Sequence, residues 1–388
     1  MILWEQLTYF FSFRDANITN VLIGTLLLGT AAGMVGTLVV LSKKTLIIDA
    51  ISHSMLPGIC IGFLLSGVKN PLYLMLGGMA SATLAVFLIG EISKRSKIKI
   101  DAAIAITLSI LFSFGVIMLN VVQNTGNPNQ SGLNDFLFGK AASMLQEDLL
   151  LFGGLCLITF ITLPLFFRHF KISLFDPIFA QSIGVKRFII QSIISFLIII
   201  TAAAGVQTVG IILISAMIIA PASASLLWTN NFKRTMIYSG VTGAVCSIVG
   251  VFISYLSPKM PTGPWVVVTL ASVSILSVLF SPNGLLVKQL QIRKNRKSIL
   301  RENVLKTVYK LKEKIIKNNQ GVSTELVSNY RPTAIRKVKK ALKHLQRKGL
   351  IVKGGDFWTL TEHGTQEAER IVRVHRLWEL YLQKFMHL

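Results

Sequence analysis

Asp49 and His53 lie four residues apart in the stretch DAISHSMLPG at positions 49–58, between strongly apolar segments. On an α-helix, side chains at i and i+4 project from one face, with Cβ atoms about 6 Å apart. A carboxylate and an imidazole form half of a site suited to Mn²⁺, Fe²⁺ or Zn²⁺. Pro57 removes one backbone hydrogen bond and is expected to loosen the same helix. The residues alone leave two interpretations open: half of a metal site, or an Asp–His hydrogen bond at a helix start.

A second stretch, FDPIFAQSIGV at 175–185, predicts a short helix in a basic loop. Its Asp176 can cap a short helix that has Pro177 at the first position. By contrast, GLNDFLFGKA at 132–141 is not a phosphate-binding P-loop, because six residues separate Gly132 from Gly139 and the stretch ends in alanine where Ser or Thr is needed. The chain is therefore not expected to hydrolyse ATP, and it is not predicted to be an enzyme.

Membrane helices are expected to position these residues. Hydrophobic residues make up 52% of the 388, and the mean hydropathy is +0.62, which is too apolar for a soluble protein of this length. A span needs about 20 apolar residues. Only a few residues around Gln207 separate two of the candidates, so eight or nine spans are predicted. The candidate segments are 18–41, 50–67, 71–91, 102–123, 149–167, 188–205, 208–228, 236–256 and 264–281.

Basic residues fall in alternate loops between these segments, which the positive-inside rule assigns to the cytoplasm. An odd number of spans would then put the N-terminus outside and the C-terminal region inside. The other loops hold only Lys69, Lys140 and Lys259. The basic loops hold Lys43 and Lys44; Lys94, Arg95, Lys97 and Lys99; Arg168, Lys171, Lys186 and Arg187; and Lys233 and Arg234.

The C-terminal region differs in composition from the rest. Residues 288–388 hold 24 of the 40 Lys and Arg residues and 8 of the 17 Asp and Glu residues. We predict a basic juxtamembrane linker at 288–300, whose run QIRKNRK suits anionic lipid headgroups. Over 301–388, three helical segments and a hairpin turning at Gly354–Gly355 predict a winged helix-turn-helix.

The expected recognition helix of this fold is dense in cations. Such a surface can bind DNA, and it equally suits RNA, lipid or an acidic protein face. The candidate nucleic-acid-binding residues are Arg331, Arg336, Lys337, Lys339, Lys340 and Lys343.

Several stretches, in order along the chain, resemble the permease subunits of manganese/zinc/iron ABC transporters (ABC-3 type). The resemblance covers about residues 15–285. The stretches are DAISHSMLPGI at 49–59, DAAIAITLSILFSFGVIML at 101–119, LNDFLFGKA at 133–141, FDPIFAQSIGV at 175–185, VQTVGIILISAMIIAPASAS at 206–225 and YLSPKMPTGPWVV at 255–267.

This resemblance implies a multi-pass permease domain over 1–287 in the bacterial inner membrane. Asp49 and His53 would line the path of a transported Mn, Zn or Fe ion, with no permanently bound cofactor. The implied partners are a second permease copy or paralogue, cytoplasmic ABC ATPase subunits and an extracytoplasmic metal-binding protein, besides membrane lipid. The implied ATPase-coupling residues are Phe175, Asp176, Pro177, Ala180 and Gly184.

The stretch LTEHGTQEAERIVRVHRLWELYL at 360–382 resembles the N-terminal half of the diphtheria-toxin-repressor and manganese-regulator family. It implies that His375 and Glu379 are ligands of a regulatory metal. This chain departs from that family at Asn303 and Lys306, where such regulators carry metal ligands, and because the sequence stops at Leu388, the ligands of that family's following domain are not expected. Metal sensing by this region alone is therefore not expected.

The expected fold is thus an all-α polytopic membrane protein with a C-terminal winged helix-turn-helix cytoplasmic domain. The leading function is the permease of a divalent-metal importer. The alternative is a membrane-tethered, metal-responsive DNA-binding regulator. The sequence does not decide between Mn, Zn and Fe, between a homodimer and a heterodimer, or between DNA binding, metal sensing and a structural role for the tail.

Overall fold

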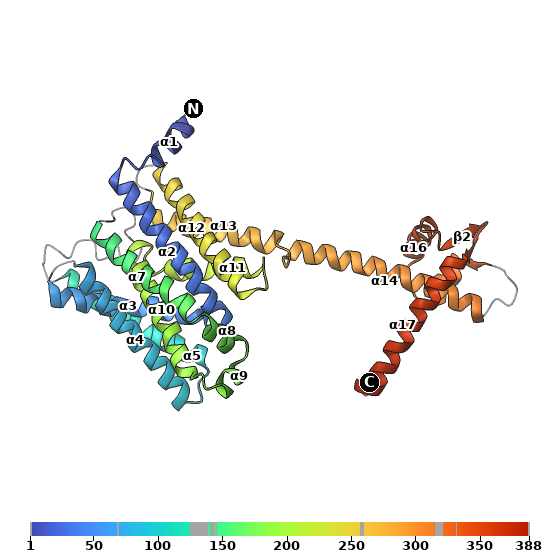
Figure 1. Ribbon diagram of the computed structural model, residues 1–388, viewed down its shortest axis with the longest axis horizontal. Helices are drawn as coiled ribbons and strands as arrows, with labels where there is room; N and C mark the ends of the chain where they lie inside the picture. The colour runs from blue at the N-terminus through green and yellow to red at the C-terminus, as the bar shows by residue number, and fades with distance from the viewer. Residues whose placement is uncertain are drawn as a thin grey trace. The chain divides into compact units, whose positions relative to one another are not determined.

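The computed structural model describes residues 2–67, 70–124, 139, 144, 146–256, 260–314, 321–330 and 332–386. Lys69, Lys140, Lys259, Arg331 and most of the stretch 133–141 lie outside the described residues. The chain divides into two compact units, Met1–Leu285 (unit 1) and Leu286–Leu388 (unit 2) (Figure 1). Each unit has its own hydrophobic core.

The regular elements of unit 1 among its described residues are all helices, and eight of the helices in the described part of the chain are long and apolar enough to cross a membrane. The last of these eight begins at Thr262. The helices of unit 1 are α1 (Ile2–Phe10), α2 (Ala16–Leu41), α3 (Thr45–Ser66), α4 (Pro71–Arg95), α5 (Ile100–Gln123), α7 (Gln146–Leu165), α8 (Phe167–Phe175), α9 (Pro177–Ser182), α10 (Arg187–Thr208), α11 (Ile214–Leu226), α12 (Phe232–Tyr255) and α13 (Thr262–Phe280).

The predicted span at 208–228 is interrupted in the structure. Helix α10 continues to Thr208, and α11 begins only at Ile214. With 13 residues, α11 is about 20 Å long, short of the roughly 30 Å of a hydrocarbon core. The chain just after α11 is tied to the end of α13, since the Trp228 indole N–H donates to the Ser277 hydroxyl at 3.1 Å.

Helices α2 and α12 cross closely and run in opposite directions. Gly29 lies against the backbone of Gly243, and Gly33 lies against the backbone of Ser239. The Ser239 hydroxyl donates to the Gly33 carbonyl. A Cβ at Gly33 would overlap the Ser239 backbone, so the close approach depends on glycine.

Helices α12 and α13 also run in opposite directions, which makes α13 parallel to α2. The Thr269 hydroxyl donates to the Cys246 carbonyl at 2.9 Å, and Gly250 packs on the backbone of Val266. The beginning of α2 and the end of α13 therefore lie at opposite ends of unit 1. Eight crossings would put them at the same end. Among the described residues, the loop 209–213 together with α11 supplies the further crossing.

Unit 2 combines helices with a small antiparallel sheet of order β1-β3-β2. Val322 pairs with Trp358, and Ile351 pairs with Leu360. Its elements are α14 (Leu285–Lys314), β1 (Val322–Ser323), α15 (Thr324–Tyr330), α16 (Ile335–Arg347), β2 (Ile351–Gly354), β3 (Phe357–Leu360) and α17 (Glu362–Met386).

Three details of unit 2 differ from the sequence expectation. Residues 288–300, predicted as a linker, lie within the long helix α14. The hairpin turns at Gly355–Asp356 because Gly354 still pairs with Phe357; Gly355 has φ +60°, which favours glycine. The short strand β1 was not predicted, since two residues carry no readable alternation of apolar and polar side chains.

Candidate functional site

Helix α3 carries the pair Asp49 and His53. The helix begins at Thr45, and its N-cap is Lys44, whose side chain makes no capping hydrogen bond. Asp49 therefore lies in the second turn, where backbone N–H groups already have partners within the helix. No Asp49–His53 hydrogen bond is found among the described residues. The structure therefore gives no support to a hydrogen bond at the helix start, and the metal-site interpretation of the pair stays a prediction.

The His53 imidazole is half-buried with an unused nitrogen. Its Nδ1 atom is buried and has no hydrogen-bond partner in the described residues. The ring meets Phe112 of α5 edge to face, with centroids 4.8 Å apart. An unpaired buried polar atom costs about 1–3 kcal/mol, so a nitrogen in this state is suited to a ligand that is not present here.

One copy of the chain supplies only part of a metal site. In the part of the chain that the structure describes, no cluster of three or more His, Cys, Asp or Glu residues could hold a metal ion. The cysteines Cys60, Cys156 and Cys246 are free and buried. The Cys60 thiol instead faces the Gly115 carbonyl, at 3.9 Å. Thiolate ligands therefore do not complement Asp49 and His53.

The Asp49 end of α3 is also the basic end of the bundle. Burial lowers the pKa of Lys44, and the nearby positive charge of Arg187 lowers it further. Lys44 precedes α3 and Arg187 begins α10, so two of the predicted cytoplasmic loops meet at one end of unit 1.

Helix α9 presents a compact apolar surface. Asp176 caps it as predicted, since the carboxylate accepts the backbone N–H of Phe179 at 2.9 Å, and Pro177 occupies the first position. Ala180 is buried, whereas Ile178 is 81% exposed. Phe175 is exposed too, although its ring edge meets Phe232 with centroids 6.0 Å apart.

The chain leaves α9 through a glycine-dependent turn. Gly184 has φ +82°, a backbone conformation that side chains other than glycine rarely adopt. Sequence analysis missed the exposed residues Ile178, Phe179 and Ile183. Their signal was present, because a loop between two spans seldom holds so many large apolar side chains.

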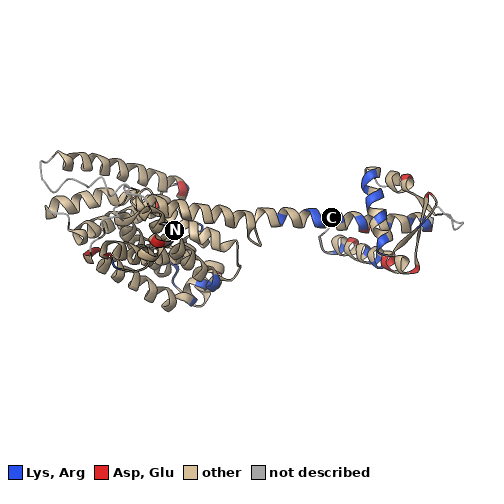
Figure 2. Cartoon of the chain, turned by 90° about the horizontal axis from the view of Figure 1, so that it is seen from above, with Lys and Arg blue, Asp and Glu red and all other residues tan. Residues whose placement is uncertain are grey.

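Unit 2 brings the predicted cations to one helix but does not complete a metal site. Five of the six, Arg336, Lys337, Lys339, Lys340 and Lys343, lie exposed on α16, whose opposite face is buried in the core. Figure 2 shows Lys and Arg concentrated in this unit, whereas unit 1 is mostly uncharged. His375 and Glu379 lie exposed on α17, and no third ligand joins them among the described residues.

Comparisons with known proteins agree with the division of the chain into unit 1 and unit 2. The model of the ABC 3 transport family matches residues 14–281. The manganese transport system membrane protein MntC of Bacillus subtilis is 36% identical over 389 residues, covering 100% of this chain and 87% of that protein. The zinc transport system membrane protein TroC of Treponema pallidum is 35% identical over 290 residues, covering 75% of this chain and 97% of that protein.

A solved structure shares the fold of the membrane part. The structure of PsaBC from Streptococcus pneumoniae in complex with Fab includes a chain that superposes with a TM-score of 0.64 and 30% sequence identity. The match covers 71% of this chain and 97% of that chain. The family match ends before unit 2, whereas the Bacillus subtilis protein matches through it.

Proposed function

The chain belongs to the ABC 3 transport family, and we propose that it is the membrane permease subunit of an importer for manganese or zinc ions. The relatives compared above are named for manganese or zinc and not for iron, so the proposal leaves iron out. As a permease, the chain performs no catalysis itself, and a separate ATPase supplies the energy. The protein is a multi-pass component of the bacterial inner membrane.

The observation that carries the metal path is the unused Nδ1 atom of His53, on the same face of α3 as Asp49. In a permease pair with two-fold symmetry, two copies contribute two carboxylates and two imidazoles. Four such ligands suit a divalent ion of this class, and two negative charges balance it. Because thiolates are absent from the pair, the site binds the ion without trapping it as a soft-metal site would.

The exposed apolar side chains of α9 and of Phe175 just before it support the assignment of an ATPase as a binding partner. We propose that Phe175, Ile178 and Phe179 dock into a groove on the cytoplasmic ATPase subunit, with the Asp176 cap holding the helix in shape. Exposed aromatic and aliphatic side chains on a rigid helix are the usual anchors of such interfaces. An extracytoplasmic metal-binding protein would deliver the ion at the opposite face.

Transport by the reconstituted complex tests the proposal. The permease, its ATPase and its binding protein are placed in proteoliposomes, and ATP-dependent uptake of Mn²⁺ and Zn²⁺ is followed separately, with Mg²⁺ as the control ion. We expect uptake of Mn²⁺ or Zn²⁺ and none of Mg²⁺. Binding of metal with no ATP-dependent uptake would contradict the importer.

We further propose that unit 2 is a winged helix on the cytoplasmic side. The order of α14, α15, α16 and the β2–β3 hairpin supports this fold, as does the placement of the cations on α16. DNA binding by this surface is the second candidate function. The full chain in lipid nanodiscs should then bind duplex DNA with a steep salt dependence and a sequence preference. Binding that ignores sequence would leave a generic basic surface.

A further inference from the structure

Helix α17 has two halves with different surroundings. In the first half, Ala368 and Val372 are buried in the core of unit 2. In the second half, large apolar side chains are exposed: Val374 is 49% exposed, Leu377 60% and Trp378 58%. Water-exposed apolar surface of this extent on one helix marks an interaction site more often than chance exposure.

The apolar residues follow a regular spacing. From the half-buried Ile371, the exposed Val374, Trp378 and Tyr381 continue at intervals of three and four, which is the spacing of a coiled-coil seam. Trp378 and Tyr381 meet edge to face with centroids 5.8 Å apart, so the two rings form one surface. Arg376 lies on the opposite side of the helix. The seam itself carries no charge, which makes it unsuited to nucleic acid.

We propose that this seam, defined by the exposed residues Val374, Trp378 and Tyr381, docks onto the same seam of a second copy of the chain. The inference rests on the proposed permease pair. Two identical copies inserted in the same direction carry their tails on the same side of the membrane. Each tail therefore meets the other at an effective concentration of about millimolar, without any encounter from solution.

The area of the seam is large enough for a contact between two chains whose membrane parts are already paired, but too small for a stable dimer of separate molecules. An aromatic side chain buries roughly 150–250 Å² when fully covered. With three residues about half exposed on each copy, the pair would bury several hundred Å² in total, below the roughly 1,200 Å² at which stable dimers begin. The contact is therefore weak between separate molecules and is formed only where the membrane parts already pair.

Cysteine cross-linking tests the contact in the full-length complex. The native cysteines are buried, so a new surface cysteine is the reactive one. Val374→Cys places a thiol on the seam, and Arg376→Cys places one on the opposite side of the same helix as the matched control. A short bis-maleimide is added to the complex in proteoliposomes. We expect a covalent dimer for Val374→Cys at several times the yield of the control.

A second pair of measurements separates the outcomes. Adding Trp378→Lys to Val374→Cys should reduce the cross-link to the control yield, while chromatography with light scattering still shows paired permeases. A monomeric permease would defeat the proposed pair itself. Paired permeases without the Val374→Cys cross-link would overturn only the docking of the tails. If added vesicles protect the thiol of the Val374→Cys variant from aqueous maleimide and no cross-link forms, the seam belongs to the membrane surface, which also overturns the docking.

Discussion

Each unit contains a helix on which a histidine and a carboxylate lie four residues apart: His53 with Asp49 in unit 1, and His375 with Glu379 in unit 2. In unit 1, His53 is half-buried against Phe112 and has an unused nitrogen. In unit 2, His375 and Glu379 are exposed to water. A ligand that binds the first pair gives a partner to a buried nitrogen that has none among the described residues. A ligand of the second pair must instead displace water from both side chains, which costs free energy.

The comparison shows that spacing alone does not define a site. Spacing i to i+4 aligns two side chains on any helix. Burial decides whether leaving the two polar side chains without a ligand costs free energy of folding. Where that cost is present, ligand binding is the simplest reason for the pair. The two units can be separated experimentally on this basis, since each should respond differently to the loss of its pair.

The largest effect is expected from the unit 1 pair. Asp49→Asn removes a charge that balances the cation, and His53→Ala removes a nitrogen ligand with little packing. In a two-fold pair each change deletes two ligands, so metal uptake in proteoliposomes should fall to background. His375→Ala and Glu379→Gln should leave uptake near normal.

Matched controls keep this result interpretable. Asp101→Asn alters an exposed carboxylate in the first turn of α5, and His169→Ala alters an exposed histidine of α8. Both should transport normally. Because Asp49 lies in the second turn and caps nothing, near-normal uptake by a well-expressed Asp49→Asn protein would exclude the ligand role.

A smaller but clear effect is expected at α9. Asp176→Ala removes the cap, which costs about 1 kcal/mol of helix stability, and Gly184→Val forces a side chain into a φ of +82°. Co-purification of the ATPase should weaken several-fold or more, with the membrane fold intact. Gln181→Ala, an exposed change on the same helix, is the control. Unchanged co-purification in both variants would remove α9 from the interface.

A destabilising substitution in the core of unit 2 should show whether transport by unit 1 depends on the folding of unit 2. Leu342 is fully buried among residues of α14 and α16. Leu342→Ala should destabilise unit 2 by about 2–5 kcal/mol. Limited proteolysis of the full chain should then cut within unit 2 first, while uptake persists. Loss of uptake in parallel with that proteolysis would make unit 2 a required part of the transporter.

Most of unit 1 could be predicted from sequence because apolar length is a direct signal. The predicted start at Asp176–Pro177 is observed, since a cap and a proline act locally. A break was predicted around Gln207, and the structure places it a few residues later, between Thr208 and Ile214, because the apolar residues 208–213 do not mark where the helix ends. The contact between His53 and Phe112 could not be predicted, because the two residues are far apart in the sequence and neither stretch contains a pattern that pairs them.

In unit 2, the amphipathic helices and the hairpin could be predicted from the sequence. The residues at which these elements begin and end were predicted less accurately. Helix α16 begins only at Ile335, although the predicted cations of this helix start at Arg331 in the sequence. The Ser328 hydroxyl donates a hydrogen bond to the Thr333 carbonyl at 2.7 Å, which occupies this carbonyl before α16 begins. The site roles of Asp49, His53 and α9 remain predictions that the variants above address, and the role of the α16 cations remains a prediction that the DNA-binding experiment addresses.

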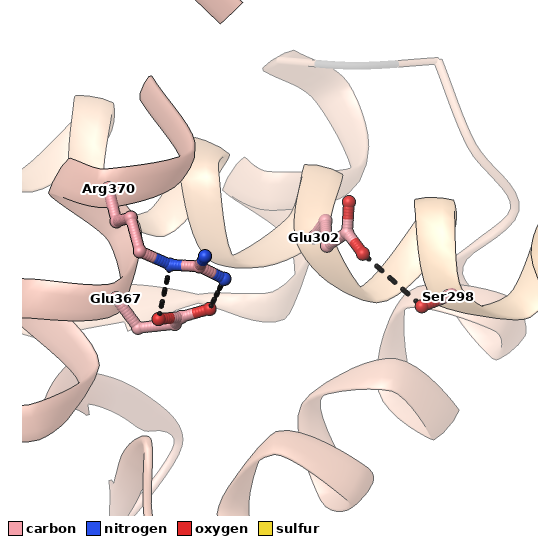
Figure 3. A network of polar contacts seen from close by, with 4 residues as sticks. All are labelled: Ser298, Glu302, Glu367 and Arg370. Atoms are coloured by element: carbon pink, nitrogen blue, oxygen red, sulfur yellow. Dashed lines mark hydrogen bonds and ion pairs between the residues drawn. The ribbon is translucent and has the colours of Figure 1, made fainter. Parts of the chain in front are cut away.

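The smallest expected effect concerns the pH response of α17. Arg370 donates two hydrogen bonds to Glu367, at 2.9 and 2.7 Å, and Figure 3 shows the paired geometry. The hydrogen bond from Arg370 is the main cause that lowers the pKa of Glu367 below its ordinary value of 4.5. A carboxylate with a lowered pKa contributes stability above the unfolded value, and the contribution is lost as pH falls through the folded value.

Hydrogen exchange of the α17 amides in the full chain measures this contribution. At pH 7, Glu367→Gln should exchange slightly faster than the wild type, because the ion pair is partly exposed and worth little. As the pH falls through the lowered pKa of Glu367, the carboxylate of the wild type becomes protonated, so the difference should shrink. Glu379→Gln changes a carboxylate on the same helix beyond the core and should alter neither rate. A difference that grows toward acid would have the wrong sign and would show that Glu367 stabilises α17 through something other than its charge.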